Sequence, residues 1–200
     1  METDDRAPCF KYPYNIQIKY TGYIDSNLSK NSPECHKEFD EMVQRKFHEY
    51  EVVFTDASKD RWTQRCGIGI YNKSRDVSMF ARCSDLTSIC TAEIQAIRYA
   101  LTTLSENAKK SLIVSDSKSA LQSIVRSGIC YWNSKTVLET KKELEILEQR
   151  NILVQLIWVP SHSGIRGNEE ADRLALKGRN VNNRIDERVH CTEIFKKIKD

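Results

Sequence analysis

The chain has 200 residues, of which 40% are hydrophobic and 30% charged, with a formal net charge of +3. This composition is ordinary for a globular chain with a sizeable core, and the small net charge excludes binding to nucleic acid through overall charge alone. No apolar run approaches the roughly 18 residues that span a bilayer, and residues 1–5 are acidic where a signal peptide would be basic. We therefore expect an intracellular protein, cytoplasmic or nuclear, without membrane contact.

The seven cysteines are odd in number and form no Cys-x-x-Cys pair, which favours reduced thiols. Cysteine and histidine are neighbours at 35–36 and at 190–191, but neither pair has a second, properly spaced pair of ligands. We interpret both as incidental rather than as a zinc site.

Residues 1–50 differ in composition from the rest of the chain. Residues 25–35 are rich in Asn, Ser and Pro and predict a linker. Residues 34–50 predict a short amphipathic helix, because apolar residues recur there at helical spacing: Phe39, Met42, Val43 and Phe47. The apolar face of this helix could pack against the following domain or against a missing protein partner.

The first predicted strand, residues 51–56, places Val52, Phe54 and Asp56 on one face. An acid on an apolar face needs an explanation, although Asp56 could simply begin the next turn. Residues 66–71 and 77–83 then predict a hairpin around a turn at 72–76. Together these segments give three antiparallel strands.

Residues 91–104 predict a helix with an apolar stripe at Ile94, Ile97, Leu101 and Leu104. The small residues Ala96 and Ala100 would hold Glu93 against the sheet, although most helical glutamates are solvated. Residues 112–116 predict a parallel strand that ends in Asp116, and α/β sheets bind ligands at that end of a strand. Two further helices are predicted at 117–126 and 132–149.

The last predicted strand, residues 152–159, ends at a proline and leads into a loop that carries His162. Gly164 and Gly167 favour unusual backbone angles there. Asn168 is a suitable N-cap for a helix to Gly178, which would place Asp172 in the first turn. A lone acid at that position usually does no more than interact with the helix dipole.

The predicted fold is therefore α/β, with a mixed sheet flanked by helices. Four acids brought together in one cleft, two from strands and two from helices, would repel one another unless divalent ions neutralise them: Asp56, Glu93, Asp116 and Asp172. Hard oxygen ligands favour magnesium or manganese over zinc. Because two such ions roughly 3.5–4 Å apart can clamp a phosphodiester, the sequence predicts metal-assisted phosphoryl transfer.

Five ordered blocks together resemble a type 1 ribonuclease H domain over residues 51–180. They read Thr-Asp-Ala-Ser at 55–58, Gly-Ile-Gly-Ile-Tyr at 67–71, Thr-Ala-Glu-Ile-Gln-Ala-Ile at 91–97, Val-Ser-Asp-Ser at 114–117, and Trp-Val-Pro-Ser-His-Ser-Gly at 158–164 followed by Gly-Asn-Glu-Glu-Ala-Asp at 167–172. The resemblance implies a ribonuclease H-like fold with a five-stranded sheet, in which strands one to three are antiparallel and strands four and five run parallel to the first. It also implies cutting of the RNA strand of RNA–DNA hybrids, which leaves 5′-phosphate and 3′-hydroxyl ends.

The resemblance also implies residue roles. Asp56 would be shared by two Mg²⁺ ions, for which Mn²⁺ can substitute, while Glu93 and Asp116 would lie on the leaving-group side and Asp172 on the side of the attacking water. His162 would assist proton movement and product release. Asn168 would approach the acids or the RNA strand.

The sequence departs from the cellular enzymes in two ways that concern the substrate. Ile89 and Cys90 stand where those enzymes tend to carry asparagines, which leaves Ser88 and Thr91 as candidates for contact with the RNA strand. The basic, tryptophan-rich protrusion is absent, and only a thin substitute remains: Trp132, Lys135, Lys141 and Lys142.

These departures resemble the ribonuclease H domains of non-LTR retrotransposons, which follow a reverse transcriptase. Residues 1–50 would then be a former linker and residues 181–200 the start of a lost extension. A reverse transcriptase or another protein could bind through residues 34–50. The alternative function is a catalytically weak or inactive domesticated fragment that binds nucleic acid or protein.

Overall fold

The computed structural model describes residues 23–29, 32–105, 107–125, 134–182 and 184–185. The elements in these ranges are β1 (Tyr23–Asp25), α1 (Cys35–Lys46), β2 (Glu51–Lys59), β3 (Cys66–Asn72), β4 (Val77–Arg82), α2 (Ile89–Thr102), β5 (Lys110–Ser115), α3 (Lys118–Val125), α4 (Ser134–Gln149), β6 (Leu153–Trp158) and α5 (Arg166–Gly178). This order confirms the predicted α/β class. Trp132, His190 and Cys191 lie outside the described residues, as do residues 1–22 of the predicted N-terminal segment and residues 186–200 of the predicted C-terminal extension.

The strands form one mixed sheet in the order β1-β6-β5-β2-β3-β4. β2, β3 and β4 are antiparallel, and β5 and β6 run parallel to β2, as predicted. The prediction of five strands is wrong, because β1 adds a sixth strand parallel to β6. A strand of three residues that pairs at a sheet edge has too few side chains to show a periodic pattern, so apolar spacing cannot predict it.

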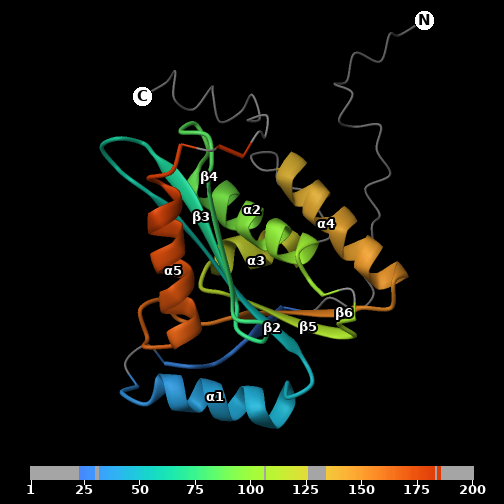
Figure 1. Cartoon of the computed structure of the whole chain (residues 1–200). Helices are drawn as coiled ribbons and strands as arrows, with labels where there is room; N and C mark the ends of the chain where they lie inside the picture. The colour runs from blue at the N-terminus through green and yellow to red at the C-terminus, as the bar shows by residue number, and fades with distance from the viewer. Residues whose placement is uncertain (1–22, 30–31, 106, 126–133, 183, 186–200) are drawn as a thin grey trace, which may run out of the picture.

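Helices cover both faces of the sheet (Figure 1), with α2, α3 and α4 on one side and α1 and α5 on the other. Alternate residues of β2 point to opposite faces. Val53 packs with the α2 side, whereas Val52 and Phe54 pack with the α1 side. Among the described residues, no helix combines the length and the apolar character that a membrane span requires.

Helix α1 packs against the sheet with its apolar face. Cys35 and Phe39 are 0% and 1% exposed, and the Phe39 ring lies 5.8 Å from the Phe54 ring. Of the two arrangements that the sequence left open, the structure therefore has the helix packed on the domain. A partner that bound at residues 34–50 would meet the polar face of α1.

Helix α5 approaches β3 so closely that only glycine fits between them. A Cβ atom at Gly69 would lie 2.1 Å from the Ala171 carbonyl oxygen and 2.4 Å from the Ala175 backbone nitrogen. Backbone atoms of a packed helix cannot move aside as the end of a flexible side chain can. The predicted acid Asp172 lies on this helix directly after Ala171, so its position depends on the same close contact.

Gly69→Ala should therefore lower the free energy of unfolding by about 1–3 kcal/mol, the usual cost of an overpacked site. It should also weaken any function that requires Asp172. Urea denaturation followed by circular dichroism measures the first effect. Ala81→Gly, on the neighbouring strand β4, is a control that removes a methyl group without adding one. Unchanged stability of Gly69→Ala would show that α5 can move away from the sheet without loss.

Candidate active site

Three of the predicted acids converge where the parallel pairing between two neighbouring strands, β2 and β5, ends. Thr55 of β2 is paired with Ser115 of β5, so the next residues, Asp56 and Asp116, lie side by side. Glu93 reaches them from α2, and carboxylate oxygens of the three side chains all lie within 4.8 Å of one another.

Glu93 is held against the sheet as predicted. Ala96 and Ala100 are fully buried, and Glu93 itself is only 6% exposed. Its Oε2 atom is buried without a hydrogen-bond partner among the described residues. A buried carboxylate oxygen without a partner is costly, which indicates a cationic ligand at this position.

The electrostatics of the cluster favour a cation. Burial, followed by the charge of Asp116, raises the pKa of Asp56 to about 8, against a hydrogen bond from the Ala57 backbone N–H. Burial and the charges of Asp56 and Asp116 raise the pKa of Glu93 well above its usual range. Burial also raises the pKa of Asp116. Each shift shows that the ionised form is disfavoured unless positive charge is supplied.

The fourth predicted acid joins the cluster from α5. The carboxyl group of Asp172 lies near enough to that of Asp56 to contribute to its raised pKa. On its other side, Asp172 belongs to a second group with His162 and Glu169, whose ligand atoms also lie within 4.8 Å of one another. The structure thus brings all four acids and the histidine to one place.

The predicted start of this last helix is wrong. α5 begins at Arg166, and Ile165 is its N-cap residue without a side-chain cap. Asn168 lies inside the helix, 3% exposed, and its Nδ2 donates to Asp116 Oδ2 at 3.2 Å. Its amide therefore contacts an acid instead of capping the helix, and Asp172 lies beyond the first turn.

The loop before α5 holds His162 in an unusual backbone conformation. His162 and Gly164 have φ angles of 51° and 76°, values that are uncommon outside glycine and that concentrate at functional sites. The prediction that Gly167 has an unusual backbone angle is wrong. Gly167 lies in the helix, where a Cβ atom would be 2.2 Å from the ring of Phe54, so close packing requires it.

Glu169 is a site residue that the sequence analysis missed. An acid near the start of a helix ordinarily does no more than interact with the helix dipole. Glu169 Oε1 accepts a hydrogen bond of 3.4 Å from the Gly164 backbone N–H, and its carboxylate lies beside His162 and Asp172. Its spacing of three residues from Asp172 could have indicated this role, because that spacing places both side chains on one helix face.

The predicted substrate residues occupy the start of α2. Ser88 is the N-cap residue, and its Oγ accepts from the Thr91 backbone N–H at 3.2 Å and bonds the Thr91 hydroxyl at 2.9 Å. Both therefore shape the helix end next to Glu93, and their contact with RNA stays a prediction. Ile89 follows Ser88 and is 45% exposed.

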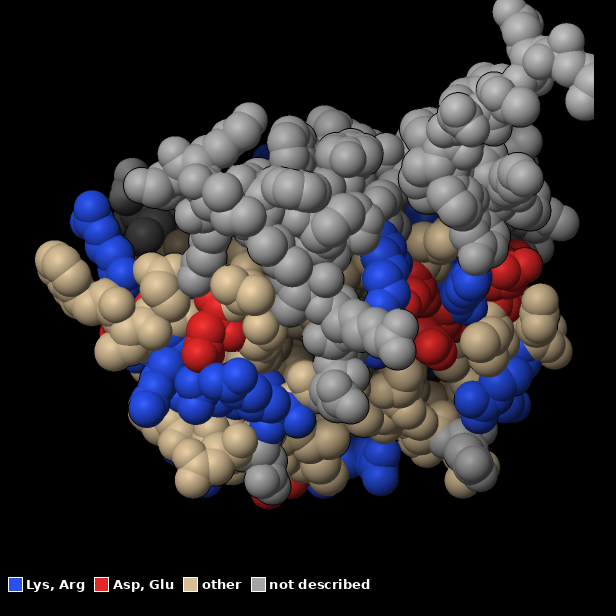
Figure 2. All heavy atoms as spheres, turned by 90° about the horizontal axis from the view of Figure 1, so that it is seen from above, with Lys and Arg blue, Asp and Glu red and all other residues tan. Residues whose placement is uncertain are grey.

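The lysines of α4, predicted as a partial replacement for the basic protrusion, are poorly placed to bind nucleic acid. Lys141 is 5% exposed, and burial lowers its pKa, so it is poorly placed to meet a phosphate. Lys135 lies 3.7 Å from Glu139. In the view of Figure 2, the described Lys and Arg side chains form several separate groups with acidic side chains between them.

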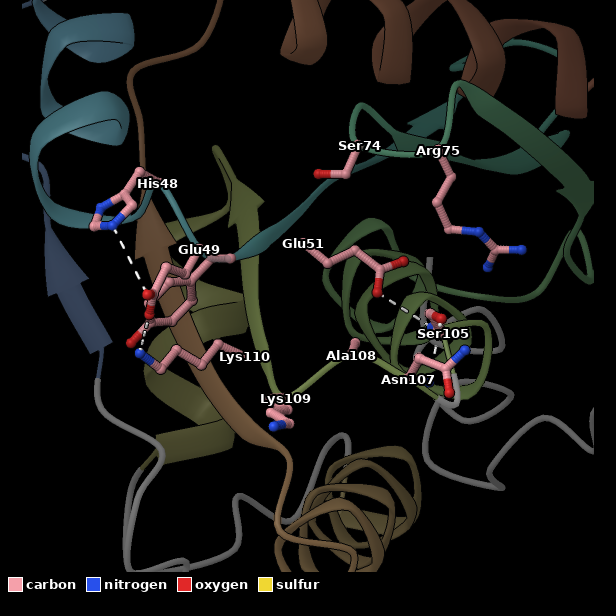
Figure 3. A pocket seen from close by; sticks show the side chains of 11 residues that line it. His48, Glu49, Glu51, Ser74, Arg75, Ser105, Asn107, Ala108, Lys109 and Lys110 are labelled. Atoms are coloured by element: carbon pink, nitrogen blue, oxygen red, sulfur yellow. Dashed lines mark hydrogen bonds and ion pairs between the residues drawn. The ribbon is translucent and has the colours of Figure 1, made fainter.

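A cavity of about 830 Å³ lies at the opposite end of the same strands, near Tyr50 and Lys110. Several charged side chains that line it already have partners within the chain (Figure 3). Lys110 forms an ion pair with Glu49, and Glu51 accepts a hydrogen bond from the Ser105 backbone N–H at 3.2 Å. This cavity is separate from the acidic cluster, which lies just beyond the last paired residues of β2 and β5, Thr55 and Ser115.

The oxygen-only donors at the centre of the cluster fit a hard divalent cation such as magnesium. Such a site can stabilise charge on a phosphate, and the neighbouring histidine can exchange a proton with water.

Comparison with known proteins gives one family. The RNase H family matches residues 48–180. Ribonuclease H1 from Rattus norvegicus is 31% identical over 140 residues, which are 64% of this chain and 49% of the relative. Ribonuclease H1 from Homo sapiens is 29% identical over 145 residues, 65% of this chain and 50% of the relative. The chain thus spans about half the length of the curated relatives it matches.

Proposed function

Because the chain belongs to the RNase H family, we propose that it hydrolyses the RNA strand of RNA–DNA hybrids and leaves 5′-phosphate and 3′-hydroxyl ends. The observation that carries the proposal is the convergence of Asp56, Glu93 and Asp116 within 4.8 Å, with Asp172 near Asp56. Acids buried this closely have no structural purpose that a neutral side chain would not serve better.

The proposed cofactor is Mg²⁺, two ions, with Mn²⁺ as a substitute. Asp56, Glu93 and Asp116 would hold one ion, and Asp172 with Asp56 would hold the other. The partnerless Oε2 of Glu93 and the raised pKa values of the cluster support this assignment. When bound, magnesium supplies neutralising charge and polarises the scissile phosphate.

The chain's own groups would position the reactants. Asn168 donates to Asp116 Oδ2 and so fixes which oxygen of Asp116 faces the site. His162 is exposed beside Asp172, where its imidazole can take a proton from water or give one to product. Ser88 and Thr91, at the start of the helix that carries Glu93, are the proposed contacts to the RNA strand.

The test is cleavage of a labelled RNA–DNA hybrid in magnesium, beside duplex DNA and duplex RNA of the same sequence. We expect cuts only in the hybrid, only in its RNA strand, and none with EDTA or with the Asp116→Asn variant. Mass spectrometry of the products should show 5′-phosphate ends. A folded protein that binds the hybrid and leaves it intact would instead support the alternative, a nucleic-acid-binding module without useful catalysis.

The finer assignment, to a domain once joined to a retrotransposon reverse transcriptase, rests on the sequence departures alone. Ile89 and Cys90 replace polar residues at the start of α2, and Lys141 is buried. The relatives reported above are named Ribonuclease H1. The subtype, and a protein partner at residues 34–50, therefore stay predictions.

A further inference from the structure

The loop between β2 and β3 presents a large apolar side chain to solvent. Trp62 is 89% exposed, more than any other exposed large hydrophobic residue that the structure describes. The loop projects beyond the sheet, beside the carboxyl end of α5 (Figure 1). An exposed tryptophan forgoes the burial energy that this side chain normally contributes, so its position calls for a partner.

The loop holds Trp62 in a defined position. Asp60 Oδ1 accepts hydrogen bonds from the backbone N–H groups of Trp62 and Thr63, at 2.9 and 2.7 Å, and from the Thr63 hydroxyl at 3.0 Å. Hydrogen bonds from Thr63 hold the pKa of Asp60 below its usual range. Arg179 of the α5 end lies 3.9 Å from the other oxygen of Asp60. The backbone of the loop is therefore already ordered before a ligand packs on the indole, which lowers the entropic cost of binding.

The same loop carries two exposed arginines, one directly before Trp62 and one three residues after it. Arg61 and Arg65 are both exposed, and neither guanidinium belongs to an ion pair with another described residue. An exposed aromatic ring on a loop that also carries free arginines is a combination that binds single-stranded nucleic acid, because the ring stacks on a base while the cations meet phosphates.

The loop lies at the same end of the sheet as the acidic cluster. β2 continues from Asp56 to Lys59 before the loop begins, a distance of about 10 Å at the usual rise of a strand. A strand of nucleic acid that leaves the acidic cluster can thus reach Trp62 within a few nucleotides.

We propose that Trp62, with Arg61 and Arg65, forms a stacking site for an unpaired nucleotide that continues from the hybrid. The inference rests on the proposed function, because the hybrid at the acidic cluster brings the single strand to the loop. The ligand is a single strand rather than the hybrid itself, since base faces inside a duplex are covered by their neighbours. The unpaired extension can belong to the DNA or to the RNA.

The test compares the Kd of three labelled hybrids in EDTA: one with blunt ends, one with a short single-stranded DNA extension and one with an RNA extension. For the wild-type protein we expect at least one extension to tighten binding about tenfold, the effect of one stacked base. Trp62→Ala should abolish this gain without changing the Kd for the blunt hybrid, and Trp62→Phe should keep most of it. Ile146→Ala, which alters another exposed apolar side chain, is the matched control.

The inference is overturned if neither extension tightens binding, or if Trp62→Ala keeps the gain. It is also overturned if Trp62→Ala weakens binding to the blunt and extended hybrids equally, because Trp62 would then contact the duplex. Cleavage of the blunt hybrid in magnesium is measured separately. Its absence would refute the proposed function, while the comparison of Kd values would still decide the role of Trp62.

Discussion

Asp56→Asn is expected to lower the rate of hybrid cleavage by at least about 10³-fold, because it removes a ligand whose cation contributes several kcal/mol to the transition state. Asp56 lies at the centre of the cluster, close to Glu93 and Asp116 and near Asp172. The asparagine is nearly isosteric, so the fold should persist. Single-turnover cleavage of the labelled hybrid measures the loss.

The same substitution should stabilise the protein in EDTA at neutral and higher pH. The pKa of Asp56 is raised from 3.8 to about 8 in the folded state. The stabilisation that comes with protonated Asp56 is therefore complete below about pH 4 and is lost as the pH rises toward 8. Across this window the free energy of unfolding of the wild type should fall, and each unit of raised pKa corresponds to about 1.4 kcal/mol.

Urea denaturation at pH 5 and pH 8, in EDTA, measures this effect. The variant should show a smaller decrease between the two pH values, whereas Glu41→Gln, an exposed acid on α1, should behave like the wild type. Magnesium should restore stability to the wild type at pH 8 by binding the folded state, and it should do less for the variant. A variant that is less stable than the wild type at pH 8 in EDTA would show that the ionised acid makes favourable contacts of its own.

The four acids could be predicted because each follows a feature that is local in sequence. Asp56 and Asp116 each follow a short apolar run, and Glu93 precedes two alanines on one helix face. The parallel register of β2 and β5 then places the first two side by side. The strong periodic elements were predicted correctly for the same reason, since apolar spacing reports directly which face is buried.

The features that could not be predicted depend on contacts between distant residues. Asn168 reads as a helix cap in the sequence, but its amide bonds Asp116 across the site. In the sequence, Glu169 suggests only an interaction with the helix dipole, whereas in the structure the loop places His162 beside it. Trp62 and the two arginines of its loop show no periodic pattern, and the loop takes its shape from hydrogen bonds such as those to Asp60. Such tertiary contacts override what local propensity predicts.

His162→Ala is expected to lower the turnover number about 10²-fold, near the lower end of what a positioned acid or base contributes. His162 is exposed, and its nearest described carboxylates are Glu169 and Asp172. Its removal should therefore leave both the free energy of unfolding and the Kd for the hybrid nearly unchanged. Added imidazole should restore part of the activity to the alanine variant and none to Asp56→Asn, because only the former lacks a proton carrier. If the loss appears in KM, or if imidazole has no effect, His162 contacts the substrate rather than moving a proton.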